Sequence, residues 1–393
     1  MNVLRHNLPK LEIYKMKRYI SKLHIENFRA FKKLDVQFNS GFNFIIGPNG
    51  CGKTSILRSI IMCYSLNNSE DSRFGKNIKF WCDVSEENTI PTNVRSVHRI
   101  GTIPIFYNIT KDTSSYRNTF HSIGQGYGLN PPINEIEVSD LRTTANSSNY
   151  SPLIIGAYRK VDYHLIQGMK RELEIAESIK KYLSSLPNYL NGSSSPDIKQ
   201  WMINRYFIIE KDWAQEEKVN WEWLLEKLPL IAPQESKFKF SRIEKDLEPI
   251  FSINDTECYL EELSSGFQSI LSIILTIFEW IESTNARENI LVNKAFGTVM
   301  IDELDVHLHP QWQLIVSYGL KQIFPNLQFI VTTHSPHIIA SADKNEVIIV
   351  PELSEEMDLK PTEKKFNGWT TDEILEEVMG VTNLVNKRYT LRN

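Results

Sequence analysis

The sequence predicts an α/β fold in which a mostly parallel sheet is flanked by helices. Two observations support this prediction. After Pro249, helix-periodic stretches alternate with short apolar runs, an order typical of a parallel sheet covered on both faces. Near the N-terminus, a buried-strand pattern and a helix-periodic stretch are joined by a Gly-rich turn at residues 47–54, which fits the phosphate-binding pattern G-x-x-x-x-G-K-[ST].

The N-terminal region should contain antiparallel strands. Residues 20–25 and 34–38 alternate apolar and polar side chains, which predicts two half-exposed strands, and residues 42–46 are nearly all apolar, which predicts a buried one. A helix is expected over 54–64. In the polar stretch that follows, only short pieces such as 103–107 resemble strands, and 152–158 is a further buried-strand candidate.

The middle of the chain is expected to be a helical insert. Residues 169–183 and 197–228 are rich in helix formers, and a loop at 191–196 separates them, so two helices could form a hairpin. In the C-terminal half, the pattern predicts helices and strands in the order 265–283 (helix), 298–301 (strand), 311–323 (helix), 328–332 (strand), 336–342 (helix) and 347–350 (strand). Thr370 and Glu373 form a capping-box pattern before a short helix.

Composition sets limits on the class of protein. A chain of 393 residues allows two or three domains, and a formal net charge of -4 means that contact with nucleic acid would need a local basic patch. The four cysteines are scattered, which suits a reducing cytosol. The longest apolar run, 270–281, is too short to span a bilayer. We therefore expect a cytoplasmic protein without a membrane segment.

The Gly-rich turn predicts a nucleotide site for ATP and Mg²⁺. Glycines let backbone N–H groups curl around a phosphate, and the helix that follows presents its positive N-terminus. Lys53 would reach the β- and γ-phosphates, and the Thr54 hydroxyl would bind Mg²⁺. The alternative is a chance loop. The expected nucleotide-binding residues here are Gly47, Pro48, Asn49, Gly50, Cys51, Gly52, Lys53, Thr54 and Ser55.

An apolar run ending in two acids, 296–303, is the second candidate for chemistry. Ligands of open α/β sheets bind at the carboxyl ends of strands, so Asp302 would hold Mg²⁺ through water and Glu303 would act as the general base for water. The alternative is a pair of solvated acids at a strand end.

Two further motifs are weaker when taken alone. Ser264, Ser265 and Gly266 precede an apolar helix and could bind the γ-phosphate of a nucleotide held by another subunit, although a capped helix start is the simpler interpretation. His334 ends the strand expected at 328–332, where an imidazole could donate a hydrogen bond to the γ-phosphate, although a lone His at a strand end is more often structural.

In this order, the four motifs resemble the ABC-type ATPase heads of the RecF, SMC and OLD proteins, and residues 23–31, 303–309 and 334–336 resemble the OLD-related branch. The resemblance implies a discontinuous ATPase head at 18–165 and 238–350, a helical insert at 166–237 and a C-terminal element at 351–393. It also implies a homodimer or higher homo-oligomer, with Arg29 near the nucleotide base and Asp305 in the loop that contacts the other subunit.

The resemblance has two departures. The family's Mg²⁺-sensing glutamine is missing from residues 154–159, where an equivalent is expected, and Gln125 and Gln167 are only weak candidates. OLD proteins carry a Toprim nuclease after the ATPase, whereas only about sixty residues follow His334, fewer than the usual domain size of roughly 100 residues. We therefore expect no built-in nuclease.

Residues 368–381 are similar to the C-terminal element of ATPases in bacterial antiphage systems, with Septu-type systems, which pair the ATPase with an HNH nuclease, as the nearest match. This favours an ATP-gated dimer that controls a separate effector. The alternative is a RecF-like ATPase that binds DNA, but the basic residues 170, 171, 180 and 181 alternate with acids, a pattern typical of helical ion pairs. The residues that follow Glu303 argue against a subunit of a membrane transporter, and the intact motifs argue against a purely structural role.

Overall fold

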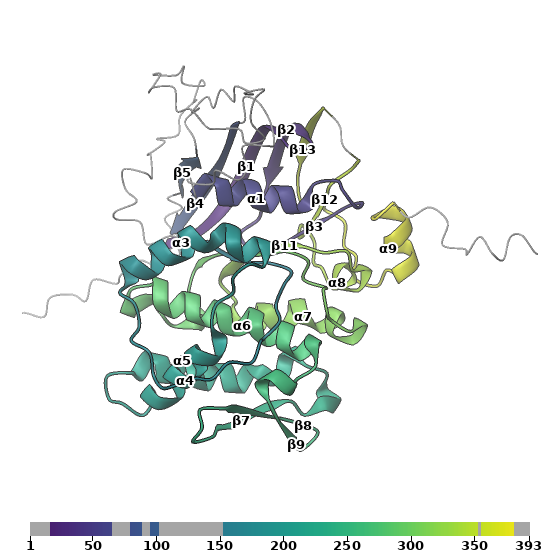
Figure 1. The fold of residues 1–393 in the computed structure, drawn as a ribbon. Helices are drawn as coiled ribbons and strands as arrows, with labels where there is room; N and C mark the ends of the chain where they lie inside the picture. The colour runs from purple at the N-terminus through teal and green to yellow at the C-terminus, as the bar shows by residue number, and fades with distance from the viewer. Residues whose placement is uncertain (1–15, 65–78, 89–94, 102–151, 353–354, 381–393) are drawn as a thin grey trace, which may run out of the picture.

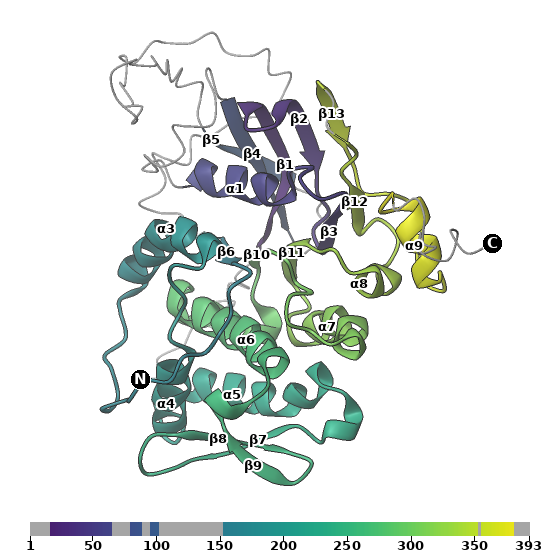
Figure 2. The ribbon, with the colours of Figure 1, turned by 45° about the vertical axis from the view of Figure 1, so that its right-hand side comes forward.

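The structure, a computed structural model, describes residues 16–64, 79–88, 95–101, 152–352 and 355–380. These residues form a mixed α/β fold with two five-stranded sheets and one three-stranded sheet. Figures 1 and 2 show the sheets and helices stacked in layers, with the central parallel sheet between the antiparallel sheet and the helical region. The expected strand at 103–107 lies outside the described residues.

The first sheet is the antiparallel region expected near the N-terminus. The central strand β1 pairs antiparallel with β2 and with β4, and β4 pairs antiparallel with β5. The alternating burial of β2 confirms a half-exposed strand. Spatial order across the sheet is β13 (Glu356–Leu359), β2 (Phe31–Gln37), β1 (Met16–Phe28), β4 (Lys79–Asn88) and β5 (Arg95–Gly101).

The second sheet is parallel in each of its described pairings, as predicted. Segments far apart in the sequence meet there, so the carboxyl ends of its strands gather the motifs at one edge. Every residue of the three central strands is buried, which explains their nearly continuous apolar sequences. The strand order is β12 (Val347–Ile349), β3 (Phe42–Ile46), β11 (Leu327–Thr332), β10 (Gly297–Ile301) and β6 (Leu153–Ile155).

Helices cover both faces of the parallel sheet. Helix α1 (Lys53–Tyr64) contacts β4, β5 and β11, so it lies between the two large sheets. On the opposite side lie α6 (Ser265–Thr284), which is buried along most of its length, and α7 (Pro310–Ile323), with the short α8 (Pro336–Ala340) beside it. Within the described ranges, every helix is too short or too polar to cross a membrane.

Residues 166–237, which we expect to be a helical insert, differ from a two-helix hairpin. They contain three helices, which pack onto the rest of the fold rather than onto each other alone: α3 contacts α1, α6 and β6, α4 contacts α6, and α5 contacts α7. Below them lies a three-stranded antiparallel sheet that the sequence did not predict. The bounds are α3 (Ile175–Asn191), α4 (Ile198–Ile208), α5 (Gln215–Lys227), β7 (Lys239–Ile243), β8 (Pro249–Ile253) and β9 (Thr256–Tyr259).

The helix expected over 169–183 was placed too early. Residues 168–174 are not helical, because tertiary contacts hold them extended against α4: the Asn204 side chain accepts a hydrogen bond from Lys170 N at 3.1 Å and donates one to Lys170 O at 2.9 Å. The stretch 197–228 is likewise interrupted at 209–214. Short 3₁₀ helices occupy Leu228–Ile231, Gln234–Ser236, Leu260–Glu262, Arg287–Asn289 and Val292–Lys294.

The described part of the C-terminal element docks on the rest of the fold. Strand β13 extends the first sheet by pairing parallel with β2. Helix α9 (Thr371–Glu377) contacts α8 and begins at the predicted capping box, in which Glu373 N donates to Thr370 Oγ1 at 3.3 Å and Thr370 N donates to Glu373 Oε2 at 2.7 Å. Phe366 is buried and packs edge-on against Trp369.

Candidate functional site

The phosphate loop joins β3 to the N-terminus of α1, the strand–loop–helix context that the motif needs. Gly50 and Gly52 have φ values of +80° and +100°, which favour glycine. At Gly52 a Cβ atom would also lie 2.4 Å from the Phe31 ring, so no larger residue fits there without movement. Asn49 and Gly50 are exposed at the tip of the loop, Pro48 is half-buried, and Cys51 is buried behind them.

Lys53 is buried at the start of α1, and its ammonium group lies over the loop. Its Nζ atom donates hydrogen bonds to the carbonyl oxygens of Gly47 at 3.0 Å and Pro48 at 2.9 Å. Burial lowers the pKa of Lys53, and the thiol of Cys51 and the carboxylates of Asp302 and Glu303 oppose that shift. The cation is therefore already aimed at the loop where a phosphate would bind.

Thr54 and Asp302, both expected at the metal site, are in direct contact. Thr54 Oγ1 donates to the Asp302 carboxylate, 3.1 Å from each oxygen, and Thr332 Oγ1 donates to Asp302 Oδ1 at 2.5 Å. Asp302 is buried at the carboxyl end of β10. A hydroxyl and a carboxylate this close together fit Mg²⁺, which prefers oxygen ligands and a few protein groups alongside phosphates.

Glu303 follows Asp302 in an unusual backbone conformation. Its φ is +50°, in the left-handed region that a non-glycine residue occupies only when neighbouring contacts hold it there. Two such contacts are present: Glu303 N donates to Thr332 Oγ1 at 2.7 Å, and Glu303 O accepts a hydrogen bond from Arg159 at 2.9 Å. Its side chain is half-buried. The backbone therefore fixes the direction in which this carboxylate leaves the sheet.

Arg159 is a site residue that the sequence did not identify. Its guanidinium is buried and donates to the carbonyl oxygens of Asp302 and Glu303, to Gly156 O at 2.9 Å, and to Ser269 Oγ at 3.3 Å. Burial lowers its pKa to about 10, a shift that the nearby acids oppose, so the group is charged at neutral pH. The only available signal was its position in the segment where a glutamine was expected.

The two candidates for that glutamine lie elsewhere. Gln125 falls outside the described residues, and Gln167 is exposed on the extended segment that leads to α3. Residues 154–159 do reach the carboxyl end of the sheet, as expected, because Asp302 N donates to Ile155 O at 2.9 Å. The group that this segment brings to the acids is thus a guanidinium and not an amide.

Asp305 and His334 meet in the next layer of the site. One carboxylate oxygen of Asp305 accepts hydrogen bonds from Thr333 Oγ1 at 2.6 Å and from the backbone N–H of His334 at 3.0 Å. Asp305 is half-buried, whereas His334 is exposed just beyond β11. The Asp305 carboxylate therefore ties the two loops together within the chain, and the imidazole stands at the open edge of the sheet.

Arg29 reaches the first turn of α1. It lies in the turn between β1 and β2 with φ of +53°, and its Nη1 atom donates to Ser55 Oγ at 3.2 Å. This contact places a cation beside the phosphate loop. A role at the nucleotide base stays a prediction.

Ser264, Ser265 and Gly266 form the N-terminus of α6. Ser264 stands at the capping position, but its side chain makes no capping hydrogen bond, and both serines are exposed. The simpler interpretation, in which the serine side chain caps the helix by a hydrogen bond, therefore does not apply to Ser264. Gly266 is packed so closely on Trp312 that a Cβ atom would lie 1.8 Å from the indole ring. The first turn of α6 therefore has no side chain at this position.

Comparison with known proteins shows which family the chain belongs to. A model of the AAA domain matches residues 22–279, and a second AAA-domain model matches residues 234–340. The Septu protein PtuA of Bacillus thuringiensis is 31% identical over 94% of this chain and 86% of its own length. The "Retron Ec83 probable ATPase" of Escherichia coli is 23% identical over 91% of this chain and 76% of its own. An SMC head bound to the C-terminal winged helix of ScpA aligns over 84% of this chain and 94% of its own, at 18% identity and a TM-score of 0.46.

Proposed function

Because the chain belongs to the AAA-domain ATPase family, we propose that it binds and hydrolyses ATP as a homodimeric switch that controls a separate effector in bacterial antiviral defence. The observation that carries the ATPase part is the convergence of Lys53, Thr54, Asp302 and Glu303 at one edge of the sheet, with Thr54 Oγ1 and the Asp302 carboxylate 3.1 Å apart. These four side chains match the roles that phosphoryl transfer to water requires.

Each residue has a defined task in the proposed reaction. Loop N–H groups and Lys53 bind the β- and γ-phosphates, and Thr54 and Asp302 would hold Mg²⁺, which supplies positive charge to the phosphate oxygens when bound. Water attacks the γ-phosphorus, Glu303 accepts a proton from that water, and the bond to the β–γ bridging oxygen breaks to release ADP. Arg159 and Thr332 keep the Glu303 backbone in place during this step.

The dimer is inferred from the serines that one chain leaves unused. Ser264 and Ser265 present hydroxyls and bare N–H groups at the positive end of α6, which attracts phosphate. We infer that they bind the γ-phosphate held by a second copy, so that ATP joins the two copies and hydrolysis separates them. His334, on the exposed edge, would contact the same phosphate.

The role in defence rests on the likeness to the Septu protein PtuA and to the retron ATPase. We propose that the effector is a separate protein such as an HNH nuclease. The RecF-like alternative, DNA binding by the chain itself, is not favoured by the basic residues of the insert, since Lys170, Arg171 and Lys181 each lie within 4 Å of a carboxylate, at 3.8, 3.9 and 3.7 Å.

The test of this function is the Glu303→Gln protein, in which binding is kept and proton acceptance is lost. With ATP and Mg²⁺ it should have twice the monomer mass by light scattering, and without nucleotide it should return to the smaller mass. Lys53→Ala is the matched control that cannot bind phosphate. If the Glu303→Gln protein has the same mass with and without ATP, the proposal of an ATP-dependent dimer is wrong, even if the wild type hydrolyses ATP.

A further inference from the structure

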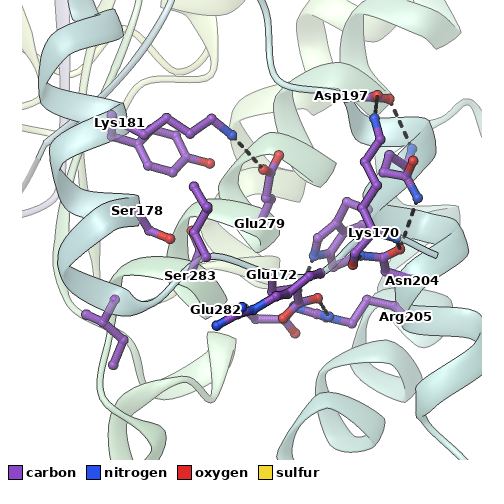
Figure 3. Close-up of a pocket in the computed structure, with 16 residues that line it drawn as sticks. Lys170, Glu172, Ser178, Lys181, Asp197, Asn204, Arg205, Glu279, Glu282 and Ser283 are labelled. Carbon is purple, nitrogen blue, oxygen red and sulfur yellow. Dashed lines mark hydrogen bonds and ion pairs between the residues drawn. The ribbon is translucent and has the colours of Figure 1, made fainter.

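A second cavity lies in the insert, away from the phosphate loop. Its volume is about 250 Å³, and it is lined by residues of α3, α4, α6 and the non-helical segment 168–174 (Figure 3). At about 30 Å³ per water molecule, it holds more than a single bridging water. Glu279 on its wall follows Ser265 by fourteen residues on α6, which corresponds to about 21 Å along the helix axis.

Much of the charge around the cavity is already paired. The Arg205 guanidinium binds Glu282 and Glu172, and Trp201 Nε1 donates to Glu282 Oε2 at 3.0 Å. In the part of the chain that the structure describes, two acceptors and one hydroxyl group, that of Tyr182, are left without a partner on the cavity wall. Glu279 Oε2 and Gln200 Oε1 are buried and have no hydrogen-bond partner among the described residues, and Gln200 is only 6% exposed.

Glu279 Oε2 and Gln200 Oε1 accept hydrogen bonds, and the Tyr182 hydroxyl can donate or accept one, so the interior of the cavity suits a ligand that carries N–H donors beside an acceptor. The nearest cation to Glu279 is Lys181, whose Nζ atom lies 3.7 Å from Oε1, the other carboxylate oxygen (Figure 3). Burial raises the pKa of Glu279 to about 7, which reflects how poorly the present surroundings stabilise its charge. An unsatisfied buried polar group costs about 1–3 kcal/mol, so a ligand that supplies donors would recover stabilisation here.

The walls and the mouth restrict the ligand further. Tyr182, Trp201 and Leu173 line the cavity and offer flat or apolar surface to a planar ring. At the mouth, the side chains of Lys170, Arg171 and Lys181 are 68%, 89% and 45% exposed. Each of them also lies within 4 Å of a carboxylate, so they do not form the continuous basic surface that a DNA duplex needs, but their exposed charges can repel a purely cationic ligand and attract one small anionic group outside the cavity.

We propose that this cavity binds a guanine nucleotide, with the base inside and the phosphate at the basic mouth. The guanine edge carries N1–H and N2–H₂ side by side, a donor pair that matches a carboxylate such as Glu279, and Gln200 Oε1 accepts a further N–H. The ring lies against Tyr182 or Trp201. A free nucleotide and a guanine at the end of a single strand present the same chemistry, and the site is separate from the ATP site.

The experiment is isothermal titration of the full chain with its phosphate loop first saturated by a non-hydrolysable ATP analogue and Mg²⁺. The probes are GMP, IMP, which lacks the 2-amino group, guanosine, and a five-nucleotide single strand ending in guanine. GMP should saturate the site below about 1 mM, and IMP should bind roughly tenfold more weakly because one hydrogen bond to a charged group is lost. Binding of the strand alone would assign the site to nucleic acid.

Two variants localise the binding. Glu279→Gln should weaken the binding of GMP, or of the strand, at least tenfold. The control Glu226→Gln, on the exposed side of α5, should leave the affinity unchanged. Lys170→Met, at an exposed position where the substitution should not disturb folding, should weaken the binding of GMP several-fold and leave the binding of guanosine unchanged. Absence of binding by both GMP and the strand, or equal affinity in the Glu279→Gln and wild-type proteins, would overturn the proposal.

Discussion

Arg159 donates a hydrogen bond to the carbonyl oxygen of Glu303 at 2.9 Å, so a fully buried guanidinium holds the backbone of the residue that we assign as the general base. The same side chain donates to Ser269 Oγ at 3.3 Å, one turn into α6. Arg159 therefore contacts both the backbone of the proposed general base of one site and the helix that would serve the other site.

Replacing Arg159 should impair turnover more than nucleotide binding. Arg159→Lys keeps the charge but cannot reach both carbonyls, so kcat should fall about tenfold, equivalent to about 1.4 kcal/mol, while KM for ATP changes less than threefold. Arg159→Met, which also removes the charge, should lower kcat further. Steady-state ATPase assays measure both constants, with Arg242→Lys, on the exposed strand β7, as the control. A rise in KM with kcat unchanged would contradict a positioning role.

Mg²⁺ should act through Thr54. In a thermal melt, saturating ATP at 100 times its Kd should stabilise the wild type by about 2.7 kcal/mol, and EDTA should remove part of that effect. Thr54→Val keeps the shape of the side chain but loses the hydroxyl, so its melting temperature with ATP should no longer respond to EDTA. An equal EDTA response in the variant would place the metal elsewhere.

Gly266 should be intolerant of a side chain because of Trp312. Gly266→Ala should lower the melting temperature by several degrees, since small-to-large changes in packed sites cost about 1–3 kcal/mol. Trp312→Leu should restore much of that loss when combined with it, and Ser283→Ala, on the same helix, should be neutral. If the double variant is as unstable as the sum of the two single variants, the contact between these residues is not the cause.

Glu279 should make stability depend on pH. Burial raises its pKa from 4.5 to about 7, with Lys181 and Arg205 opposing and Asp197 reinforcing the shift. Between these values the folded chain holds the proton that the unfolded chain has released, so stability falls as the pH rises from about 4.5 to 7. Glu279→Gln should therefore melt above the wild type at pH 8 and close to it at pH 4.5. A gain that is the same at both pH values would contradict this assignment.

Local patterns predicted the part of the fold that holds the candidate ATP site. Strands β3, β10 and β11 are buried on both faces, so their apolar runs identify them without knowledge of their neighbours. The phosphate loop needs glycine at fixed positions, which leaves a pattern that sequence alone reveals. The same holds for the capping box at Thr370, because its two hydrogen bonds lie within four residues.

The rest depends on partners that are distant in the sequence. Residues 168–174 have helix-forming composition, but Asn204 and Arg205 of α4 hold them extended. Strands β7 and β9 are largely exposed and polar, so they lack the alternation that marks a half-buried strand. Arg159 has no pattern at all, since its role comes from carbonyl groups 143 and 144 residues away.

We propose that each ATP is bound by two copies of the chain at once, and a mixing assay tests this proposal most directly. Lys53→Ala removes phosphate binding, and Ser264→Arg blocks the serine face, so each protein alone should have no ATPase activity. Mixed, they can form a pair with one intact site, built from Lys53 of one copy and Ser264 of the other, and activity should reappear. A mixture that stays as inactive as its two components would contradict the shared site.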